Sequence, residues 1–350
     1  MKLHPAIRAL LLPASWVFEV IVRLRAWLFR IGVLSQKRLN GVVISVGNLT
    51  IGGTGKTPMV MWLAQRLFDR GKRVGILSRG YRGRVLSDAE LTAAGADSSV
   101  VMSDETWMMK RAFRGRAHLG VGADRYEHGK ILERAGTEWF LLDDGFQHLN
   151  LYRDVDIVLV DATDPLGGGA LLPAGRQREP TSALARADIV VITRSHHAPA
   201  IETLIRRFTD APLFYAQPDL EEICPEQHSI VQGELGEWLG RKIFAFCAIG
   251  NPAAFFEDVQ RWGMSLAGQM AFPDHHSYTR ADAAEIERRA RDAGAEVLLC
   301  TAKDTFNLAA VRFRGFPLFA CRITMKVSEP DEFWRALDAV LERKRAEKAR

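Results

Sequence analysis

A glycine-rich segment directly behind a run of apolar residues predicts phosphate chemistry. It follows the apolar residues 42–46 and reads Thr50-Ile51-Gly52-Gly53-Thr54-Gly55-Lys56-Thr57. In the order strand, turn, helix, such a segment surrounds a polyphosphate with backbone N–H groups. The lysine reaches the outer phosphates and the threonine hydroxyl holds Mg²⁺. The strict pattern has glycine where this chain has Thr50. The alternative is a glycine-rich turn that binds nothing, and the segment does not say what receives the phosphate.

Two acidic residues at the end of a second apolar run, residues 139–142, predict a metal site beside this loop. Asp143 and Asp144 stand where a Walker B element has its carboxylate, at the carboxyl edge of a strand. There a carboxylate can organise Mg²⁺ directly or through water. Acidic pairs are also common turn formers, so this interpretation depends on the loop upstream. Gln147 and His148 could position a phosphate or a water molecule, although a histidine in such a turn is more often structural.

Three further segments concentrate charged or titratable residues in turns. Residues 78–83, Ser-Arg-Gly-Tyr-Arg-Gly, carry two arginines that suit an anion or form an ordinary basic turn. Residues 172–180 follow three glycines and include Arg178 and Glu179, which could serve a transferred phosphate and a metal. Residues 272–278 hold one acid, two histidines and a tyrosine, with no cysteine nearby. General acid–base chemistry therefore fits this last segment better than a zinc site.

The elements that must position these residues alternate between strand and helix. Helical spacing of apolar residues from Pro58 to the closing Gly71 predicts a helix behind the loop, and proline suits its first turn. Short apolar runs typical of buried parallel strands recur at residues 42–46, 74–78, 139–142, 157–160, 189–192, 242–248 and 297–301. This alternation predicts a doubly wound α/β fold.

Length and composition predict two domains behind a short N-terminal segment. The chain has 350 residues, 47% hydrophobic and 25% charged, which is ordinary for a globular protein with room for two cores. We expect a membrane-surface helix in residues 1–35 and a nucleotide-binding and catalytic domain in residues 36–215. A smaller α/β domain would follow in residues 216–350. Extended stretches at residues 213–216 and 316–325 could pair as hinge strands, and a C-terminal helix from about Pro330 could return to either domain.

The first 40 residues are basic and apolar. They hold seven lysines and arginines against the single acid Glu19, whereas the whole chain has a net charge of +5. The apolar residues 9–22 fall short of the roughly 20 needed to span a bilayer. One alternative is a cleaved signal peptide, but no cleavage site of small residues follows the apolar stretch. The other alternative is a helix packed on the protein's own core. We favour an amphipathic helix in a membrane surface, with its arginines facing anionic head groups. Its inserted side chains would be Trp16, Phe18, Trp27, Leu28 and Phe29.

The cysteines argue against a disulfide framework. They lie far apart without any C-x-x-C pair, at Cys224, Cys247, Cys300 and Cys321. This spacing predicts core thiols in a reducing compartment and no structural zinc site.

In order along the chain, the motifs resemble the tetraacyldisaccharide 4'-kinase family, the lipid A 4'-kinases of Gram-negative bacteria. The motifs run to about residue 305 and are Gly-Asn-Leu-Thr before Gly-Gly-Thr-Gly-Lys-Thr-Pro, Ser-Arg-Gly-Tyr, Ser-Asp-Glu at 103–105, Leu-Asp-Asp-Gly-Phe-Gln-His, Leu-Pro-Ala-Gly-x-x-Arg-Glu-Pro, Phe-Pro-Asp-His-His and Thr-Ala-Lys-Asp. The resemblance implies a P-loop NTPase-like fold. It also implies ATP- and Mg²⁺-dependent phosphorylation of the 4'-hydroxyl of a tetraacylated glucosamine disaccharide 1-phosphate, at the cytoplasmic face of the inner membrane.

The resemblance also assigns roles to single residues. Lys56 and Thr57, with the rest of residues 50–57, would hold the β- and γ-phosphates and Mg²⁺. Asp104 would be the base that accepts the proton of the sugar hydroxyl, with His275 orienting it, and Arg178 would contact the transferring phosphate. The acids that would serve the metal and its waters are Glu105, Asp143, Asp144 and Glu179.

The rival class is a P-loop switch or a metallochaperone-type NTPase that acts on a protein partner. A guanine-nucleotide switch usually has Asn-Lys-x-Asp at the end of a late strand. The equivalent place after residues 189–192 reads Thr193-Arg194-Ser195-His196. This difference and the Asp-His-His cluster favour a small-molecule kinase. Nucleic acid is not an expected partner.

Overall fold

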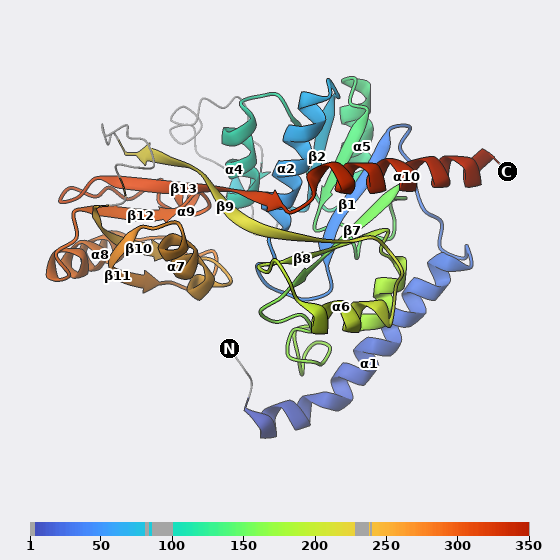
Figure 1. The fold of residues 1–350 in the computed structure, drawn as a ribbon, viewed down its shortest axis with the longest axis horizontal. Coiled ribbons are helices and arrows are strands. Elements are labelled where there is room, and N and C mark those ends of the chain that lie inside the picture. Colours follow the sequence, from blue (N-terminus) through green and yellow to red (C-terminus); the bar gives the residue numbers. More distant parts are fainter. Residues whose placement is uncertain (1–3, 81–83, 86–100, 228–237, 239, 350) are drawn as a thin grey trace. The chain divides into compact units, whose positions relative to one another are not determined.

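The computed structural model describes residues 4–80, 84–85, 101–227, 238 and 240–349 (Figure 1). The chain forms two compact units. Unit 1 comprises residues 1–79, 115–217 and 325–350, and unit 2 comprises residues 80–114 and 218–324. The units thus interleave along the chain, whereas the boundaries expected from the sequence, at residues 36 and 216, divide it into contiguous pieces. Tyr81, Arg82 and Gly83 of the basic turn lie outside the described residues.

Unit 1 contains a parallel sheet. Its strands are β1 (Val42–Asn48), β2 (Val74–Ser78), β5 (His118–Val121), β6 (Trp139–Asp143), β7 (Val155–Asp161) and β8 (Ile189–Thr193). They lie in the order β8-β7-β1-β6-β2-β5, and neighbouring strands are parallel. β1 therefore lies between β6 and β7, and the loops that follow β1 and β6 emerge side by side at the carboxyl edge. In α/β sheets this edge, where the strand order reverses, is where ligands bind.

Burial explains why these strands read as apolar runs. All five residues of β2 and all seven of β7 are buried, because both faces of the sheet are covered. The doubly wound α/β fold predicted from the sequence is thereby confirmed. β5 was not predicted, because it is only four residues long and its first residue, His118, is exposed.

Helices complete unit 1. They are α1 (Pro5–Arg30), α2 (Lys56–Asp69), α5 (Arg125–Arg134), the 3-10 helix η1 (Thr181–Arg186), α6 (Pro199–Arg206) and α10 (Pro330–Ala349). α2 begins at Lys56, within the glycine-rich segment, and packs against β1, β2 and β6. The predicted C-terminal helix is α10, and it belongs to unit 1. There Phe333 packs edge-on against Trp62 of α2, with ring centroids 5.3 Å apart, and the Lys344 ammonium donates to Asp188 at 2.6 Å.

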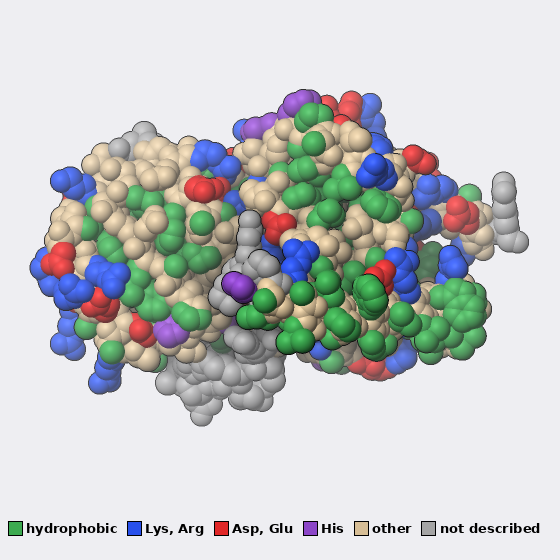
Figure 2. All heavy atoms as spheres, turned by 90° about the horizontal axis from the view of Figure 1, so that it is seen from below, with side chains coloured by type: hydrophobic (Ala, Val, Ile, Leu, Met, Phe, Trp, Pro, Cys, Tyr) green, Lys and Arg blue, Asp and Glu red, His purple; other side chains and the backbone are tan. Residues whose placement is uncertain are grey.

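α1 exposes large apolar side chains. Trp16 is 70% exposed, Val20 64% and Trp27 46%, whereas Phe18 and Phe29 are half-buried. Figure 2 shows hydrophobic side chains gathered on the side of the molecule where α1 lies, with lysine and arginine side chains among them. In the described part of the chain, no helix has the length and apolar character needed to cross a membrane.

Unit 2 contains a second parallel arrangement of strands. β10 (Lys242–Cys247), β11 (Ser265–Ala271), β12 (Val297–Thr301) and β13 (Leu318–Val327) lie in the order β11-β10-β12-β13. β3 (Arg84–Val85) and β4 (Val101–Met102) form a short separate pair. The helices are α4 (Asp104–Phe113), α7 (Pro252–Arg261), α8 (Arg280–Asp292) and α9 (Asp304–Asn307).

Two long strands carry the chain between the units. β9 (Leu213–Glu226) and β13 each begin in one unit and end in the other, and they are neighbours in the sheet order. The extended stretches predicted at residues 213–216 and 316–325 are thus strands. Their use as a hinge stays a prediction.

Candidate functional site

The glycine-rich segment forms a loop that leaves room for an anion. Gly52 and Gly55 have φ angles of 128° and 86°, which favour glycine, and Gly55 is the N-cap of α2. A Cβ atom added at Gly52 or Gly53 would meet no atom within 4 Å, so no side chain of the described residues fills the space beside them. The first N–H groups of a helix have no partner within it, so those at the start of α2 can bind an anion.

Lys56 lies across this loop. Its Nζ donates to Asn48 Oδ1 at 3.3 Å and to the Gly52 carbonyl oxygen at 3.4 Å, and lies 3.7 Å from Asp144 Oδ1. These contacts are long for charge-assisted hydrogen bonds, which are usually about 2.7–2.9 Å. The ammonium group is therefore held near the loop without a short bond that a phosphate oxygen would have to break.

The acidic pair after β6 faces the same loop. β6 pairs with β1 so that Asp143 lies opposite Val46, and Thr57 Oγ1 donates to Asp143 Oδ2 at 3.2 Å. Asp144 has a φ of 55° and turns its carboxylate toward Lys56. Hydroxyl and carboxylate oxygens are the ligands that Mg²⁺ prefers, together with water and substrate phosphates. The donor set of Thr57, Asp143 and Asp144 therefore fits a magnesium site that phosphate oxygens would complete. The described residues contain no group of three or more His, Cys, Asp or Glu that could hold a metal ion.

Arg178 clamps Asp144 to the loop. Its Nη1 and Nη2 donate to the two oxygens of Asp144 at 2.7 and 2.8 Å, and Nη2 also donates to Asn48 Oδ1 and, at 3.2 Å, to the Thr50 carbonyl oxygen. Burial alone would raise the pKa of Asp144, but Lys56 and Arg178 hold it well below its usual value. Asp144 is thus an ionised carboxylate between two cations.

Arg125 contacts the backbone of the acidic pair and also His148. Arg125 is 5% exposed, and it donates to the carbonyl oxygen of Asp143 at 3.3 Å and to His148 Nδ1 at 3.1 Å. Burial, together with the charge of Arg125, lowers the pKa of His148 to about 4. His148 is therefore a neutral imidazole at pH 7 that accepts this bond.

Glu179 is engaged within unit 1 by other side chains. Arg186 donates to its two oxygens at 2.8 and 3.0 Å, and Gln147 Nε2 donates to Oε1 at 3.1 Å. Gln147 also donates to the carbonyl oxygen of Asn48 at 3.0 Å. Of the four acids expected at the metal, Asp143 and Asp144 face Thr57 and Lys56, whereas Glu179 faces Arg186.

A second cluster of predicted site residues lies in unit 2. Asp104 opens α4 behind the N-cap Ser103, and its Oδ2 lies 2.8 Å from His275 Nδ1. Burial would raise the pKa of Asp104, but His275 and Lys303 lower it overall, and the bond to Asp104 raises the pKa of His275. The neighbouring His276 is bonded to Asp282 at 3.0 Å. His275 is thus the histidine that pairs with Asp104.

Lys303 links Glu105 to the same cluster. Its Nζ donates to Glu105 Oε1 at 2.8 Å. Burial opposes the charge of Lys303, but Glu105 and Asp104 raise its pKa, so the ion pair is charged. Glu105, which was expected at the metal, belongs to unit 2, whereas Asp143, the central metal candidate, belongs to unit 1.

A buried carboxyl group fixes the turn that carries His275. Asp304 is 1% exposed and accepts from the Ala248 N–H and the Tyr278 hydroxyl, both at 2.8 Å. The Ala248 carbonyl oxygen in turn accepts from the His275 N–H at 3.1 Å, and His275 has a φ of 61°. This network positions His275 through its backbone.

Sequence reasoning did not select Asn48, Lys303 or Asp304 as site residues. Each lies inside a motif that had been quoted, Gly-Asn-Leu-Thr or Thr-Ala-Lys-Asp. Their partners, such as Arg178 for Asn48 and Ala248 for Asp304, are far away in the sequence. The motifs could therefore have pointed to these residues, but the sequence does not show which partners they bond to.

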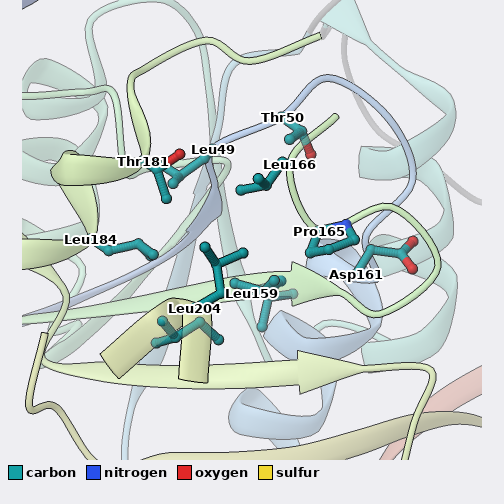
Figure 3. Close-up of a pocket in the computed structure, with 11 residues that line it drawn as sticks. Leu49, Thr50, Leu159, Asp161, Pro165, Leu166, Thr181, Leu184 and Leu204 are labelled. Atoms are coloured by element: carbon teal, nitrogen blue, oxygen red, sulfur yellow. The ribbon is translucent and has the colours of Figure 1, made fainter. Parts of the chain in front are cut away.

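A pocket lies beside the start of the phosphate loop (Figure 3). It has an empty volume of about 350 Å³, which includes space open to solvent. Its lining is mostly aliphatic, with Thr50, Asp161 and Thr181 as the polar residues. Lys56 and Arg178 do not line it, so it is separate from the phosphate cluster. The lining residues are Leu49, Thr50, Leu159, Val160, Asp161, Pro165, Leu166, Thr181, Leu184, Leu204 and Ile205.

Comparison with known proteins identifies relatives of the whole chain. The sequence profile of a family described as tetraacyldisaccharide-1-P 4'-kinase matches residues 7–342. A protein of Geobacter metallireducens, named tetraacyldisaccharide 4'-kinase, is 39% identical over 348 residues, which cover 95% of this chain and 98% of the relative. A protein of the same name from Geobacter sulfurreducens is 38% identical, and the match covers 95% of this chain and 93% of the relative. The crystal structure of the "apo" form of LpxK from Aquifex aeolicus in complex with ATP is 31% identical, has a TM-score of 0.71 and is matched over 96% of this chain and 99% of that chain.

Proposed function

The chain belongs to the tetraacyldisaccharide-1-P 4'-kinase family, and from this premise we propose the reaction and the residues that perform it. The enzyme is a kinase of lipid A biosynthesis that phosphorylates the 4'-hydroxyl of a tetraacylated glucosamine disaccharide 1-phosphate, with ATP as the phosphate donor. The observation that carries the proposal is the cluster in unit 1, where an open glycine loop, a lysine, an arginine and two acids converge.

Unit 1 supplies the residues that hold ATP. The N–H groups of residues 50–57 bind the phosphates, and Lys56 and Arg178 neutralise the charge that spreads over the transferring group. Thr57 and Asp143 would hold Mg²⁺, with Asp144 acting directly or through water. When bound, the metal neutralises phosphate charge and orients the phosphate oxygens. Glu105 and Glu179, which are paired with Lys303 and Arg186, would serve the metal and its waters.

Unit 2 supplies the base. A sugar hydroxyl is a poor nucleophile, and a carboxylate that accepts its proton makes it a better one. Asp104 is buried and has a lowered pKa, so it is ionised at neutral pH. In our proposal it takes the proton of the 4'-hydroxyl while His275 fixes the orientation of its carboxylate.

We also propose that α1 docks on the cytoplasmic face of the inner membrane. A tetraacylated substrate has its acyl chains in the bilayer and its head group at the interface. α1 exposes apolar side chains such as Trp16 and Val20, and basic residues such as Arg8 and Arg23 lie on the same helix. Apolar insertion and attraction to anionic lipids together bind such helices to membrane surfaces.

Transfer of a labelled phosphate tests the reaction. The purified chain would be given ATP labelled in its γ-phosphate, Mg²⁺ and the lipid disaccharide in mixed micelles, and the products separated into lipid and aqueous fractions. We expect label in the lipid and a matching stoichiometry of ADP. Label that stays in free phosphate, with none in the lipid, would favour the rival class of P-loop switches acting on protein partners.

Flotation with vesicles tests the docking. We expect the chain to float with vesicles of phosphatidylethanolamine and phosphatidylglycerol, and a Trp16→Asp, Val20→Asp variant to stay at the bottom of the gradient. The control is Ile131→Asp, which places one such charge at an exposed apolar position of α5. Equal flotation of the α1 variant and the native chain would contradict the docking.

A further inference from the structure

Ser15 departs from the pattern of the exposed helix α1. It is 4% exposed, whereas its neighbours Trp16 and Val17 are 70% and 61% exposed. It is the one buried side chain among the described side chains of α1. It lies on the half-buried stripe of the helix that includes Leu11 and Phe18. A small polar residue at the best-covered position of an apolar helix calls for hydrogen-bond partners.

Those partners lie in a turn far along the chain. Ser15 Oγ lies 3.0 Å from the Leu171 carbonyl oxygen and 3.3 Å from that of Leu11 in its own helix, and it donates its one proton to the nearer of the two. It accepts from the Ala174 N–H at 3.0 Å. The Leu171 carbonyl oxygen also accepts from the Gly175 N–H at 2.8 Å. A hydroxyl has one proton and two lone pairs, so this arrangement uses its donor and one acceptor site. Ser15 thus closes the turn 171–175 from outside.

The turn continues directly into the phosphate cluster. The Leu172 N–H donates to the Gln177 carbonyl oxygen at 2.9 Å, which ties the two ends of the turn together. The next residue, Arg178, donates its N–H to the Leu49 carbonyl oxygen at 2.7 Å, and the Ile51 N–H donates to Arg176 at 2.8 Å. Residues 171–178 therefore lie between Ser15 and the phosphate loop, and they carry the guanidinium that clamps Asp144.

The segment before this turn is bonded to its end, because the N–H groups of Arg176 and Gln177 donate to the carbonyl oxygens of Gly167 and Ala170 at 2.9 and 3.0 Å. Gly167, Gly168 and Gly169 have φ angles of 55°, 82° and 74°, and Pro165 and Leu166 just before them line the pocket of Figure 3. The bonds of Ser15 to Leu171 and Ala174 add to these ties from a distant part of the chain.

We propose that Ser15 is a positioning residue for phosphoryl transfer. It acts through residues 171–178 on Arg178 and on the phosphate loop, and α1 is thereby a structural arm of the phosphate site as well as the docking helix. Arg25, which donates to the carbonyl oxygen of Gln147 at 3.1 Å, gives α1 a second tie to the loop after β6. This inference rests on the proposed kinase reaction, but the contacts that carry it lie outside the reacting groups.

Two variants of Ser15 test the role of its hydroxyl. Ser15→Ala leaves the Ala174 N–H without its acceptor, and we expect kcat to fall about tenfold because misplacement by 1 Å can cost up to about 100-fold. The KM for the lipid and flotation with vesicles should be unchanged. Ser15→Thr keeps the hydroxyl and should restore most of kcat. The matched control is Thr203→Ala on α6, whose hydroxyl bonds to the Pro199 carbonyl oxygen four residues earlier and to no distant segment. Unchanged kcat in Ser15→Ala would overturn the inference.

A double-mutant cycle asks whether Ser15 acts through Arg178. If it does, Ser15→Ala should cost much less in an Arg178→Lys background than in the native chain, because that background has already lost the two-pronged clamp on Asp144. Equal fold-losses in both backgrounds would overturn the inference.

Amide hydrogen exchange gives a readout that does not depend on the reaction. The N–H groups of Ile51 and Arg178 should exchange faster in Ser15→Ala and at the native rate in Ser15→Thr and Thr203→Ala. Unchanged exchange would overturn the inference even if the kinase reaction stands. Absence of lipid phosphorylation by the native chain, with faster exchange in Ser15→Ala, would instead contradict the proposed function and leave the link between Ser15 and the phosphate loop in place.

Discussion

Asp104 and His275 form a hydrogen-bonded pair in which each side chain alters the charge of the other. Burial favours the neutral form of Asp104, whereas the histidine and Lys303 favour the carboxylate and lower its pKa overall. The bond to Asp104 likewise raises the pKa of His275 above 6.5. If Asp104 is the base, the reaction needs it ionised, so the histidine contributes by keeping the base active at lower pH.

Removal of His275 should therefore move the pH dependence of the reaction. In His275→Ala, burial is opposed mainly by Lys303, so the pKa of Asp104 rises. We expect the acid limb of kcat/KM against pH to shift to higher pH. The measurement is a pH–rate profile in mixed micelles. The control is His276→Ala, on the same turn as His275. It breaks a bond to Asp282 of α8 and should keep the native profile. An unshifted acid limb in His275→Ala would exclude Asp104 as the titrating base.

The same pair makes stability depend on pH. Because the folded-state pKa of His275 is raised, its contribution to the free energy of unfolding is fully present below pH 6.5 and is lost as pH rises through the folded value. The stability difference between the native chain and His275→Ala should therefore shrink from pH 6 to pH 9. Urea unfolding at several pH values measures it. A difference that grows with pH would contradict the charged pair.

At the scale of elements, the phosphate loop depends on one backbone conformation at the start of α2. Gly55 has a φ of 86°, and a Cβ there would lie 2.7 Å from the Cε of Met325. Gly53 has neither a left-handed φ nor a neighbour within 4 Å of an added Cβ. Two glycines of one loop, two residues apart, thus differ in what substitution by alanine would cost.

Gly55→Ala should destabilise the free protein and Gly53→Ala should not. A left-handed conformation costs a non-glycine residue about 1–2 kcal/mol, and the Met325 side chain must also move. We expect the free energy of unfolding to fall by about this amount in Gly55→Ala, measured by urea unfolding without nucleotide. A similar loss in Gly53→Ala would show that the loop is constrained by something other than this φ angle.

The sequence predicted those elements whose signals are local. β2 and β12 begin and end where their apolar runs do, at Val74–Ser78 and Val297–Thr301, because buried parallel strands contain few polar residues. β11 was missed, since each of its residues is half-buried or exposed and the strand has no buried apolar run. The bond between Asp104 and His275, 171 residues apart, is not written in either motif alone. The resemblance supplied that pairing. Without the resemblance, the sequence alone would not have shown that the two side chains meet.

At the scale of the whole molecule, the chain leaves the first unit after β2, builds α4 in the second, and returns to the first at β5. Asp104 lies in this excursion, so the proposed base and the phosphate loop belong to different units although they are close in sequence. In our proposal, the loop of unit 1 is responsible for binding ATP and the pair in unit 2 for activating the acceptor. Each function should then be lost separately.

Variants in the two units should divide ATP binding from transfer. Lys56→Ala removes a charge that faces the phosphates, so both ATP binding and lipid phosphorylation should fall. Asp104→Asn keeps the size of the side chain and removes the base, so phosphorylation should fall by 100-fold or more, about the range of general-base catalysis, while the Kd for ATP stays within about twofold of the native value. Calorimetric titration with ATP and Mg²⁺, and label transfer to the lipid, measure the two quantities on the same preparations. Weakened ATP binding in Asp104→Asn would mean that the acid of α4 also contributes to the nucleotide site, and near-native transfer would remove it as the base.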